Sequence, residues 1–308
     1  MTERGRAVTI LCAGGAVQDF IMQVDRFPEP GGKKEASAFV NTIGGQSGNA
    51  ALAVARLGGN AHYAGPIGGA DDDTANRALE MLEREGVDCG GAVRVPGGVC
   101  SVSLIMIDAT GEKLISSRRG HGLRGIAPPD AASAVATVDA VLLDNRYPDF
   151  VIPIAKAAAA RGIPRVLDID YGEAAADPTM PFCDYVIASA ESARAITGVA
   201  DLGAALMALG RGYDGFLAVT DGPAGVMWRD GGAAHHLPAF PVTAIDTLGA
   251  GDIFHAGFAV RLAETGDAVE AMRFGSAAAA LKCTHFGGAD GTPRRAAVDA
   301  FLQKHPGA

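Results

Sequence analysis

The sequence predicts an α/β fold in which a mostly parallel β-sheet carries helices on both faces. Short apolar runs such as "VDAVLLD", "IPRVLDID", "CDYVIAS" and "FLAVT" are typical of strands that are buried on both sides. Segments with a helical spacing of apolar residues lie between these runs, which is the alternation expected of a parallel sheet. Two further segments, at about 33–43 and 99–118, alternate or turn at short spacing and favour a small accessory sheet.

The first part of the chain follows a strand–helix rhythm. The run "AVTILCAGG" predicts a strand that ends in glycines, and "GNAALAVARLGG" predicts a helix closed by Gly58 and Gly59. "DDDTANRALEMLEREGV" predicts a helix with acids in its first turn and an end at Gly86. The accessory segments contain "KKEASAFVNTI" and "VCSVSLIMIDATGEKLISS", and "DATGEK" is typical of a hairpin, so we expect antiparallel strands there.

The second part of the chain adds further strands and helices without a break in composition. "IPIAKAAAARG" and "LGAALMALGRG" predict helices between or beside the buried strands. No Pro/Ser-rich linker, internal repeat or low-complexity tract divides the chain. We therefore expect a single domain over residues 1–308, in which the accessory strands are insertions.

Composition and charge exclude several classes of function. The 308 residues are 48% hydrophobic and 20% charged, which is ordinary for a globular protein with a sizeable core. A formal charge of −9 argues against a nucleic-acid surface, and no run approaches the roughly 18 apolar residues of a membrane span. The five cysteines form no C-x-x-C pair, and the N-terminus lacks a signal-peptide pattern. We expect a soluble, cytoplasmic protein that binds neither nucleic acid nor membrane.

One glycine-rich string matches a dinucleotide-binding pattern in the wrong context. "GRGYDG", from Gly210 to Gly215, fits G-x-G-x-x-G but follows a predicted helix and precedes a predicted strand. A dinucleotide site needs the opposite order, with the strand before the glycines and the helix after them. The sequence therefore disfavours an NAD-dependent dehydrogenase.

The segment "AIDTLGAGDIFHAGFAVRL" carries the strongest chemical signal. Helical spacing begins at Ile253, so the three small residues at 249–251 lie at a helix N-terminus with free backbone N–H groups that can hold an anion. Asp252 follows in the first turn, where the helix dipole is expected to lower its pKa. Anion-binding donors beside a carboxylate are the two parts that phosphoryl transfer requires. The alternative is a structural turn capped by Asp246 or Thr247, in which Asp252 only complements the dipole.

These motifs resemble those of the PfkB (ribokinase-like) carbohydrate kinases in order and spacing. "DTLGAGD" followed by "FHAGF" is similar to the family's C-terminal signature D-T-x-G-A-G-D, and "GGQSGNAALAVARLGG" is similar to its N-terminal glycine-rich signature. "VTDGPAGV" and "AAAALKCTHFGGADGTP" resemble its nucleotide-side turn and its C-terminal stretch, so the resemblance runs nearly end to end. It implies a three-layer α/β/α kinase domain, accessory strands that form a lid over the substrate, and phosphoryl transfer from ATP to a sugar hydroxyl.

The resemblance also implies roles for individual residues. Asp252 would be the catalytic base, and the backbone amides of Gly249, Ala250 and Gly251 would be the anion hole for the transferred phosphoryl group. The residues implied in sugar binding are Asp19, Gly44, Gly45 and Asn49. The residues implied near ATP are Thr220, Gly222 and Gly225 at the phosphates and ribose, with Ala279 and Cys283 at the adenine.

The implied cofactors are ATP and Mg²⁺, and the implied assembly is a homodimer formed through the lid strands. Many family members carry N-x-x-E near the metal, but this chain has "SAES", with Ser189 and Ser192 at the two motif positions. The protein ligands of Mg²⁺ are therefore left unassigned, and we expect the nucleotide and water to carry the ion. The requirement for a monovalent cation is left open, and Asp246 is expected to have a structural or ion-linked role.

Basic residues bear on which sugar the chain accepts. Lys33 and Lys34 enter the lid segment, and Arg146 follows the strand "VLLD", at the end where a parallel sheet binds ligands. These residues resemble the sulfofructose kinase branch of the family, in which a Lys and an Arg bind the sulfonate, a tetrahedral anion that both side chains suit. Ser117 departs from that branch, which would have Asn. The alternative is that both lysines are solvated and that Arg146 pairs with Asp144 or Asp149.

Two other functions stay open from the sequence. One is a nucleoside kinase of the same fold, although no aromatic residue is an obvious clamp for a base. The other is a non-catalytic sugar or nucleotide sensor, which an intact Asp252 disfavours. His255, beside the proposed site, is expected to be a packed helix residue and not a base.

Overall fold

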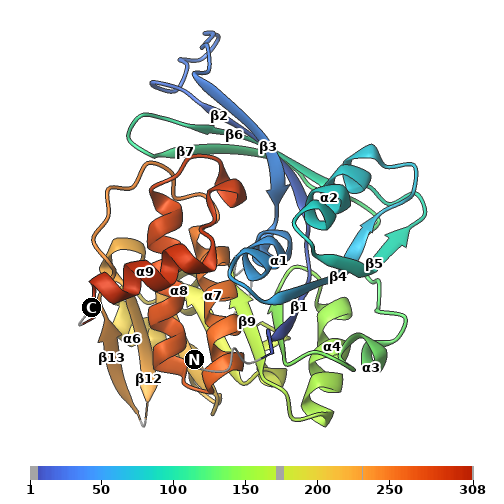
Figure 1. Ribbon diagram of the computed structural model, residues 1–308, viewed down its shortest axis with the longest axis vertical. Helices are drawn as coiled ribbons and strands as arrows, with labels where there is room; N and C mark the ends of the chain where they lie inside the picture. The colour runs from blue at the N-terminus through green and yellow to red at the C-terminus, as the bar shows by residue number, and fades with distance from the viewer. Residues whose placement is uncertain (1–5, 171–176, 231, 307–308) are drawn as a thin grey trace.

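The computed structural model describes residues 6–170, 177–230 and 232–306, which form two β-sheets and the helices that cover them (Figure 1). The main sheet is built from β1 (Thr9–Ala13), β4 (Asn60–Gly68), β5 (Asp88–Val95), β8 (Ala140–Asp144), β9 (Arg165–Ile169), β10 (Tyr185–Ser189), β11 (Phe216–Thr220), β12 (Val226–Asp230) and β13 (Ala233–Leu237). Their order is β13-β12-β11-β10-β9-β8-β1-β4-β5. The strands from β11 to β5 pair in parallel, and β12 and β13 add to one edge in antiparallel. The predicted α/β fold with a mostly parallel sheet is confirmed.

Helices cover both faces of the main sheet because successive strand residues point to opposite sides. One face carries α1 (Gln46–Arg56), α2 (Asp73–Arg84), α7 (Ala250–Thr265), α8 (Ala268–Cys283) and α9 (Arg295–Lys304). The other face carries α3 (Ala131–Ala134), α4 (Pro148–Ala160), α5 (Ala190–Thr197) and α6 (Leu202–Leu209). In β8, for example, Leu142 joins the first core, whereas Val141 and Leu143 join the second. The string "GRGYDG" lies between α6 and β11, in the helix-before-strand order that the sequence predicts.

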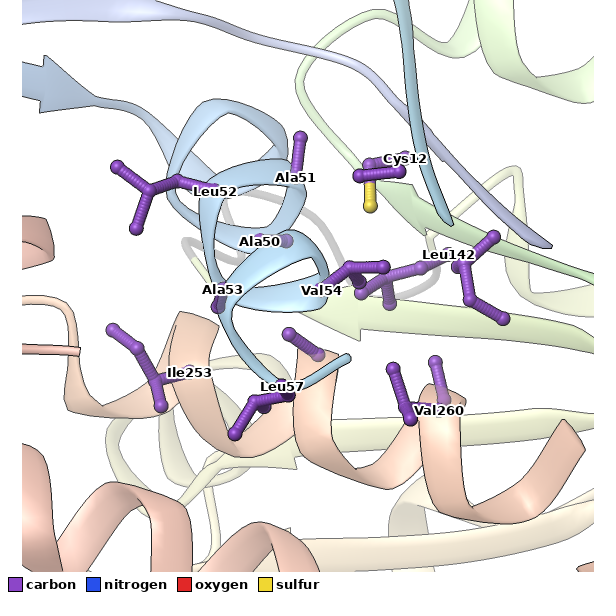
Figure 2. Packing of buried hydrophobic residues seen from close by; sticks show 14 of the residues in the cluster. Cys12, Ala50, Ala51, Leu52, Ala53, Val54, Leu57, Leu142, Ile253 and Val260 are labelled. Carbon is purple, nitrogen blue, oxygen red and sulfur yellow. The ribbon is translucent and has the colours of Figure 1, made fainter. Parts of the chain in front are cut away.

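The packing of α1 against α7 positions two segments of the candidate site. Figure 2 shows residues of α1 beside Cys12 and Leu142 of the sheet and beside Ile253 and Val260 of α7, all within one buried cluster. The alanines of the 50–53 run are small, so the α1 backbone approaches its neighbours closely. Because buried cores of this kind are close-packed, the N-terminal turns of α1 and α7 are held in fixed positions.

The second sheet projects from one end of the main body (Figure 1). Its strands are β2 (Val17–Gln23), β3 (Ala38–Gly44), β6 (Ser101–Ile107) and β7 (Lys113–Arg118), in the order β3-β2-β6-β7. The pair of β6 and β7 is the antiparallel hairpin that the sequence predicts. On one side of this sheet, Ile21, Ile105 and Ile107 form a small buried cluster against which Leu248 and Phe286 pack. This side therefore faces the main body.

Three details of the second sheet differ from the prediction. The sequence pattern misses β2, because the buried polar residues Gln18 and Asp19 interrupt the apolar alternation that marks a half-buried strand. The strands β2 and β6 pair in parallel, so the sheet is mixed and not wholly antiparallel. Strand β3 begins at Ala38 and not at residue 33, because residues 33–36 are not paired as a strand and the Ser37 amide is the first to donate to the neighbouring strand, to the Gln23 carbonyl over 2.8 Å. A single domain over 1–308, with these strands acting as a lid, stays a prediction.

The described residues contain no single helix that is long and apolar enough to cross a membrane. Within these described residues, the pair of α5 and α6 reaches the necessary length and composition only when taken together, and a 66° bend separates the two helices. Residues 1–5, on which part of the signal-peptide expectation depends, lie outside the described ranges.

Two glycines allow α7 and α8 to pack closely. A Cβ atom added at Gly275 of α8 would lie 2.6 Å from the Phe254 carbonyl oxygen and 3.3 Å from the Phe258 nitrogen of α7. A Cβ atom added at Gly257 would lie 2.9 Å from the Gly275 Cα. The helices that flank the candidate site are thus in backbone contact, with no room for a methyl group.

We expect Gly275→Ala to lower the free energy of unfolding by about 1–3 kcal/mol, because the added methyl group overpacks the contact between α7 and α8. The matched control is Gly203→Ala in α6, where an added Cβ has only ordinary contacts at 3.5 and 3.6 Å. This control is expected to be neutral or stabilising by up to about 1 kcal/mol, because alanine favours helix more than glycine does. Urea unfolding followed by circular dichroism measures both, and equal effects of the two variants would contradict the packing argument.

Candidate active site

The N-terminal turns of α1 and α7 meet the carboxyl ends of the parallel strands at one edge of the main sheet. The Asn49 amide of α1 donates to the Asp252 carboxylate of α7, with Nδ2 and Oδ2 2.6 Å apart. The Ser47 hydroxyl of α1 donates to Asp144 at the end of β8 over 2.8 Å. Parallel sheets bind ligands beyond the carboxyl ends of their strands, so this edge is the candidate site.

The turn before α7 has the backbone geometry of an anion-binding site. Gly249 adopts the left-handed conformation, with φ of 74°, and no side chain caps the helix that follows. The Ala250 amide donates to the Thr247 carbonyl over 3.2 Å. The amides of Gly249 and Gly251 have no protein acceptor within the described part of the chain. An added Cβ at Gly251 would meet nothing within 4 Å, so an anion can approach these amides.

The alternative of a purely structural turn holds only in part. Asp246 accepts a hydrogen bond from the Leu248 amide over 2.8 Å and so shapes the segment that leads into the turn. The N-cap residue itself is Gly249, and neither Asp246 nor Thr247 caps the helix with its side chain. The free amides of the turn are left available for a ligand.

The pKa of Asp252 moves opposite to the sequence-based expectation. Removal from water raises the pKa of Asp252 to about 8, and the negative charges of Asp170, Asp144 and Asp19 raise it further, while the hydrogen bond from Asn49 opposes the shift. The prediction that the helix dipole lowers this pKa is therefore wrong, because desolvation of a carboxylate outweighs a dipole. A carboxyl group with a pKa near 8 is a stronger base than an ordinary Asp once it has lost its proton.

Asp168 and His255 form a buried pair below Asp252. The Asp168 carboxylate lies 3.3 Å from His255 Nδ1, and that nitrogen is also 2.8 Å from the Gly251 carbonyl oxygen. Burial lowers the pKa of His255 to about 4, so the ring is neutral at ordinary pH. Burial and the Asp252 charge raise the pKa of Asp168 well above its usual range. His255 is thus a packed helix residue, as the sequence predicts, and it supports the first turn of α7.

The residues expected to bind a sugar lie together. Asp19 in β2 and Gly44 at the end of β3 are so close that a Cβ added at Gly44 would overlap the Asp19 carboxylate. Gly45, with φ of 79°, is the N-cap of α1, the helix that carries Asn49. Burial raises the pKa of Asp19 to about 6, and the buried Asn49 Oδ1 has no hydrogen-bond partner among the described residues. Asp19 and Asn49 therefore offer both acceptors and donors to hydroxyl groups.

Asp144 and Asp168 belong to the site, although sequence reasoning gave them no role there. Asp144 accepts hydrogen bonds from the Gly15 amide, the Ser47 hydroxyl and the Arg146 amide, at 2.6, 2.8 and 2.9 Å. The available signal was an aspartate at the end of each buried strand, in "VLLD" and "VLDID". Asp144 holds β1, β8 and α1 together, because its donors come from segments far apart in the chain.

The basic residues proposed for an anionic sugar lie in different surroundings. The Lys34 ammonium pairs with Asp25 at 2.7 Å, and Lys33 is exposed. The Arg146 charge partly opposes the effect of burial, which raises the pKa of both Asp144 and Asp170, so its guanidinium lies near the acids of the site. Of the proposed basic residues, Arg146 therefore lies near the acids of the site, whereas Lys34 is paired with Asp25.

The residues implied near ATP come from two segments outside the anion-binding turn, the β11–β12 connection and the end of α8. Thr220 ends β11, and Gly222 and Gly225 have φ of 48° and 99° in the tight connection to β12. Ala279 and Cys283 lie in the last turns of α8. The Cys283 carbonyl accepts the amides of Ile245 and of the next residue, which ties the end of α8 to the segment before the anion-binding turn.

The "SAES" segment caps helix α5 through its serine side chains. The Ser189 hydroxyl accepts the Ser192 amide over 3.1 Å, and the two hydroxyl groups are 2.9 Å apart. No group of three or more His, Cys, Asp or Glu side chains suited to a metal ion is found in residues 6–170, 177–230 and 232–306. The described side chains therefore do not form a ready cage for Mg²⁺, whose ligands would come largely from a nucleotide and water.

Comparisons with known proteins agree with this geometry. The model of the pfkB family of carbohydrate kinases matches residues 8–295. Ribokinase of Bacillus subtilis is 29% identical over 95% of this chain and 99% of its own length. The ATP-dependent ribose-1-phosphate kinase of Halopiger xanaduensis is 32% identical over 96% of this chain and 99% of its own. A crystal structure from Agrobacterium tumefaciens, provisionally assigned as a ribokinase, is 34% identical and superposes with a TM-score of 0.90 over 98% of this chain and all of that one.

We expect Asp252→Asn to stabilise the fold in a pH-dependent way. An unfolded Asp loses its proton near pH 3.8, whereas folded Asp252 holds it until about pH 8, so the wild-type protein loses stability as pH rises between these values. The variant has no such loss. Its unfolding temperature should exceed that of the wild type by more than about 3 °C at pH 8, with a smaller gap at pH 5.

Differential scanning calorimetry at both pH values measures the gap. The matched control is Asp214→Asn at an exposed position just before β11, which should show the same small difference at both pH values. A gap for Asp252→Asn that shrinks as pH rises would overturn the assignment of the pKa.

Proposed function

The chain belongs to the pfkB family of carbohydrate kinases, and we propose that it transfers the γ-phosphoryl group of ATP to a hydroxyl of a sugar, with Asp252 as the catalytic base. The observation that carries this proposal is the Asp252 carboxylate beside the free amides of Gly249 and Gly251 at the start of α7. Donors and base in one turn are the arrangement that phosphoryl transfer needs.

The proposed reaction divides into proton transfer and charge stabilisation. Asp252 takes the proton of the attacking hydroxyl as the new O–P bond forms, and the bond between the γ-phosphorus and the ADP oxygen breaks. A pKa of about 8 matches this carboxylate to a proton transfer near neutral pH. The amides of Gly249, Ala250 and Gly251 stabilise the negative charge on the phosphoryl oxygens, and the Ala250 amide is released from its 3.2 Å bond to Thr247 for this purpose.

The nucleotide is proposed to lie along the turn at Thr220, Gly222 and Gly225, with the adenine near Ala279 and Cys283. The positive φ values of both glycines support this, because such a backbone lets a ligand approach closely. Mg²⁺ neutralises charge on the phosphates when it is bound. It would arrive with ATP, since the SAES segment caps α5.

A pentose such as ribose is the proposed acceptor. Asp19, Gly44, Gly45 and Asn49 support this, because a carboxylate, an amide and two residues without side-chain bulk leave room for a polyhydroxylated ring. The names of the relatives support the same class, since they include ribokinases from several organisms.

A sugar that carries a phosphate or a sulfonate is the second candidate, and Arg146 is the observation that favours it. Its guanidinium lies close enough to Asp144 and Asp170 to affect the pKa of each, at the edge where substrate is expected. The ribose-1-phosphate kinase among the relatives acts on such a substrate by its name. Lys34, paired with Asp25, weakens the sulfofructose version, which uses a lysine as well.

The second sheet is proposed to act as a lid and to form a homodimer through its outer face. Phe39, Met22, Met106 and Leu114 lie opposite one another across the four strands, and Leu104 is on the same face. The exposed fractions are 56% for Phe39 and 58% for Leu104, which is high for large apolar side chains on one surface. A second copy of the chain would cover them. A cytoplasmic location stays a prediction.

We expect Asp252→Asn to lower kcat for sugar phosphorylation by at least ~10²-fold, the scale of a lost general base. Coupled ADP detection measures turnover on a panel of ribose, fructose, ribose 1-phosphate, a sulfonated ketose and nucleosides. Asp88→Asn is the control and should retain wild-type turnover.

The same panel separates the alternatives. Turnover on nucleosides alone would favour a nucleoside kinase. Sugars or ATP that raise the unfolding temperature without any ATP consumption would favour a sensor. Near-normal turnover by Asp252→Asn would end the proposed mechanism.

We expect the wild-type protein to have twice the 31.3 kDa mass of one chain in size-exclusion chromatography with light scattering, and Leu104→Glu to have the mass of one chain. A charge in the middle of an apolar interface is costly unless it is paired, so the variant dissociates. Val269→Glu introduces the same charge at an exposed apolar position of α8 and should remain a dimer. A monomeric wild-type protein, or two variants with equal mass, would contradict the proposed interface.

A further inference from the structure

A lysine and an aspartate are completely buried under the anion-binding turn. Lys282 of α8 and Asp246 both have no exposed side-chain surface. The Lys282 Nζ lies 3.0 Å from the Asp246 carboxylate and donates to the Asp246 backbone carbonyl over 2.8 Å. A buried ammonium is stable only where it is paired and hydrogen-bonded, and this site supplies two oxygen acceptors from one residue.

Asp246 connects the turn to the segment that follows α8. One carboxylate oxygen accepts the Leu248 amide over 2.8 Å, and the other accepts the amides of Gly287 and Gly288, each over 2.9 Å. The Cys283 carbonyl accepts the Asp246 amide over 3.2 Å. Asp246 thus forms hydrogen bonds with Cys283 at the end of α8 and with the two glycines that follow the helix. The Lys282 ammonium neutralises the negative charge of the Asp246 carboxylate.

The position of this cluster gives it an influence on phosphoryl transfer. Gly249, whose amide is proposed to bind the phosphoryl group, lies three residues after Asp246 and directly after Leu248, whose amide donates to Asp246. A change at the Lys282 ammonium would therefore move the Leu248 amide and the turn that follows it. Displacements of this kind reduce rates strongly, because donors must point at the charge that develops.

Without the lysine, the same oxygens would form a cation site. The Asp246 carboxylate and backbone carbonyl are hard oxygen ligands, and without Lys282 no positive charge would lie beside them. A monovalent cation from solution could then bind there and neutralise the carboxylate. Burial lowers the pKa of Lys282, and the Asp246 charge opposes that effect. The ammonium takes the place of such an ion, and its tether to α8 means that it is always present.

We propose that Lys282 is a built-in cation, a positioning residue that orders the 246–249 turn, so that this chain needs no added K⁺ or Na⁺ for phosphoryl transfer. The proposal rests on the proposed kinase function, and it answers the question of monovalent-cation dependence that the sequence leaves open. The carboxylate and carbonyl oxygens of Asp246 that would bind an added ion already bind the Lys282 ammonium.

The first experiment titrates the wild-type protein with KCl and with NaCl. Ionic strength is held constant with tetramethylammonium chloride, and ATP is supplied as its Tris salt, so that no alkali metal is present at the start. The expected result is a constant kcat and KM for the sugar across the titration. Activation by K⁺ of at least about fivefold, the lower end of usual coupling between sites, would overturn the proposal.

The second experiment removes the ammonium in two ways. Lys282→Ala leaves a space that an ion can enter, and Lys282→Met fills the space without charge. Both should lower kcat by about 10²-fold, the scale of a misplaced catalytic group. Ammonium chloride, and more weakly KCl, should restore Lys282→Ala along a saturable curve and leave Lys282→Met unchanged.

A merely structural role predicts a different result, because methionine replaces most of the apolar stem of lysine. Wild-type kcat in Lys282→Met, or equal behaviour of both variants toward ammonium, would contradict the proposal. Lys304→Met, at an exposed position of α9, is the matched control and should retain wild-type kcat without any response to ammonium.

Thermal unfolding separates failure of this proposal from failure of the kinase function. If the wild-type protein phosphorylates no sugar of the panel with or without K⁺, the kinase proposal has failed, and unfolding temperatures then decide the role of Lys282. Ammonium should raise the unfolding temperature of Lys282→Ala and leave that of the wild type unchanged, since a ligand stabilises only the state that binds it. If neither variant folds, the wild-type cation titration decides, and a wild type stabilised or activated by K⁺ would overturn the built-in cation.

Discussion

The burial of carboxyl groups at the carboxyl edge of the main sheet is the constraint on which the other features of the site depend. Asp19, Asp144 and Asp168 are all less than a tenth exposed, and Asp252 lies among them. A buried carboxylate is costly unless backbone amides, hydroxyl groups or cations hold it. The donors come from loops and helix ends that are distant in sequence, so satisfying the acids also assembles the fold around them. Asp144 shows this clearly, because it binds the amide of Gly15 and the hydroxyl of Ser47.

The acids of this edge divide into two kinds by the partners that they find. Asp144 and Asp246 are surrounded by donors, and they fix the backbone on either side of the site. Asp252 has one side-chain donor and is half-buried among other acids, so its proton affinity rises to the range in which it can exchange a proton at ordinary pH. The same physical cost, desolvation of a negative charge, thus gives rigidity where it is balanced and reactivity where it is not.

Local sequence patterns predicted the parts of the fold that depend on local physics. The apolar runs of β8 to β11 are buried on both faces and were predicted as parallel strands, and the small residues at 249–251 were predicted to open a helix. Strand β2 was missed because its polar residues are buried by contacts with other segments. The direction of the Asp252 pKa was wrong for the same reason, since the dipole can be inferred from the helix but the loss of water cannot. Lys282 looked like an ordinary helix lysine, and only the approach of Asp246, 36 residues earlier, makes it a buried cation.

The hydrogen bond between Asn49 and Asp252 has a consequence for the idle enzyme. ATP bound beside an unoccupied carboxylate of this strength would be open to attack by any water molecule that the carboxylate could activate. The amide of Asn49 occupies one oxygen of that carboxylate, and at pH values below about 8 a proton occupies the group as well. Asn49 is also proposed to bind the sugar, and a sugar hydroxyl that reached this carboxylate oxygen would have to share it with the Asn49 amide or displace the amide. Access of an acceptor hydroxyl to the base is therefore linked to the position of one amide side chain, that of Asn49.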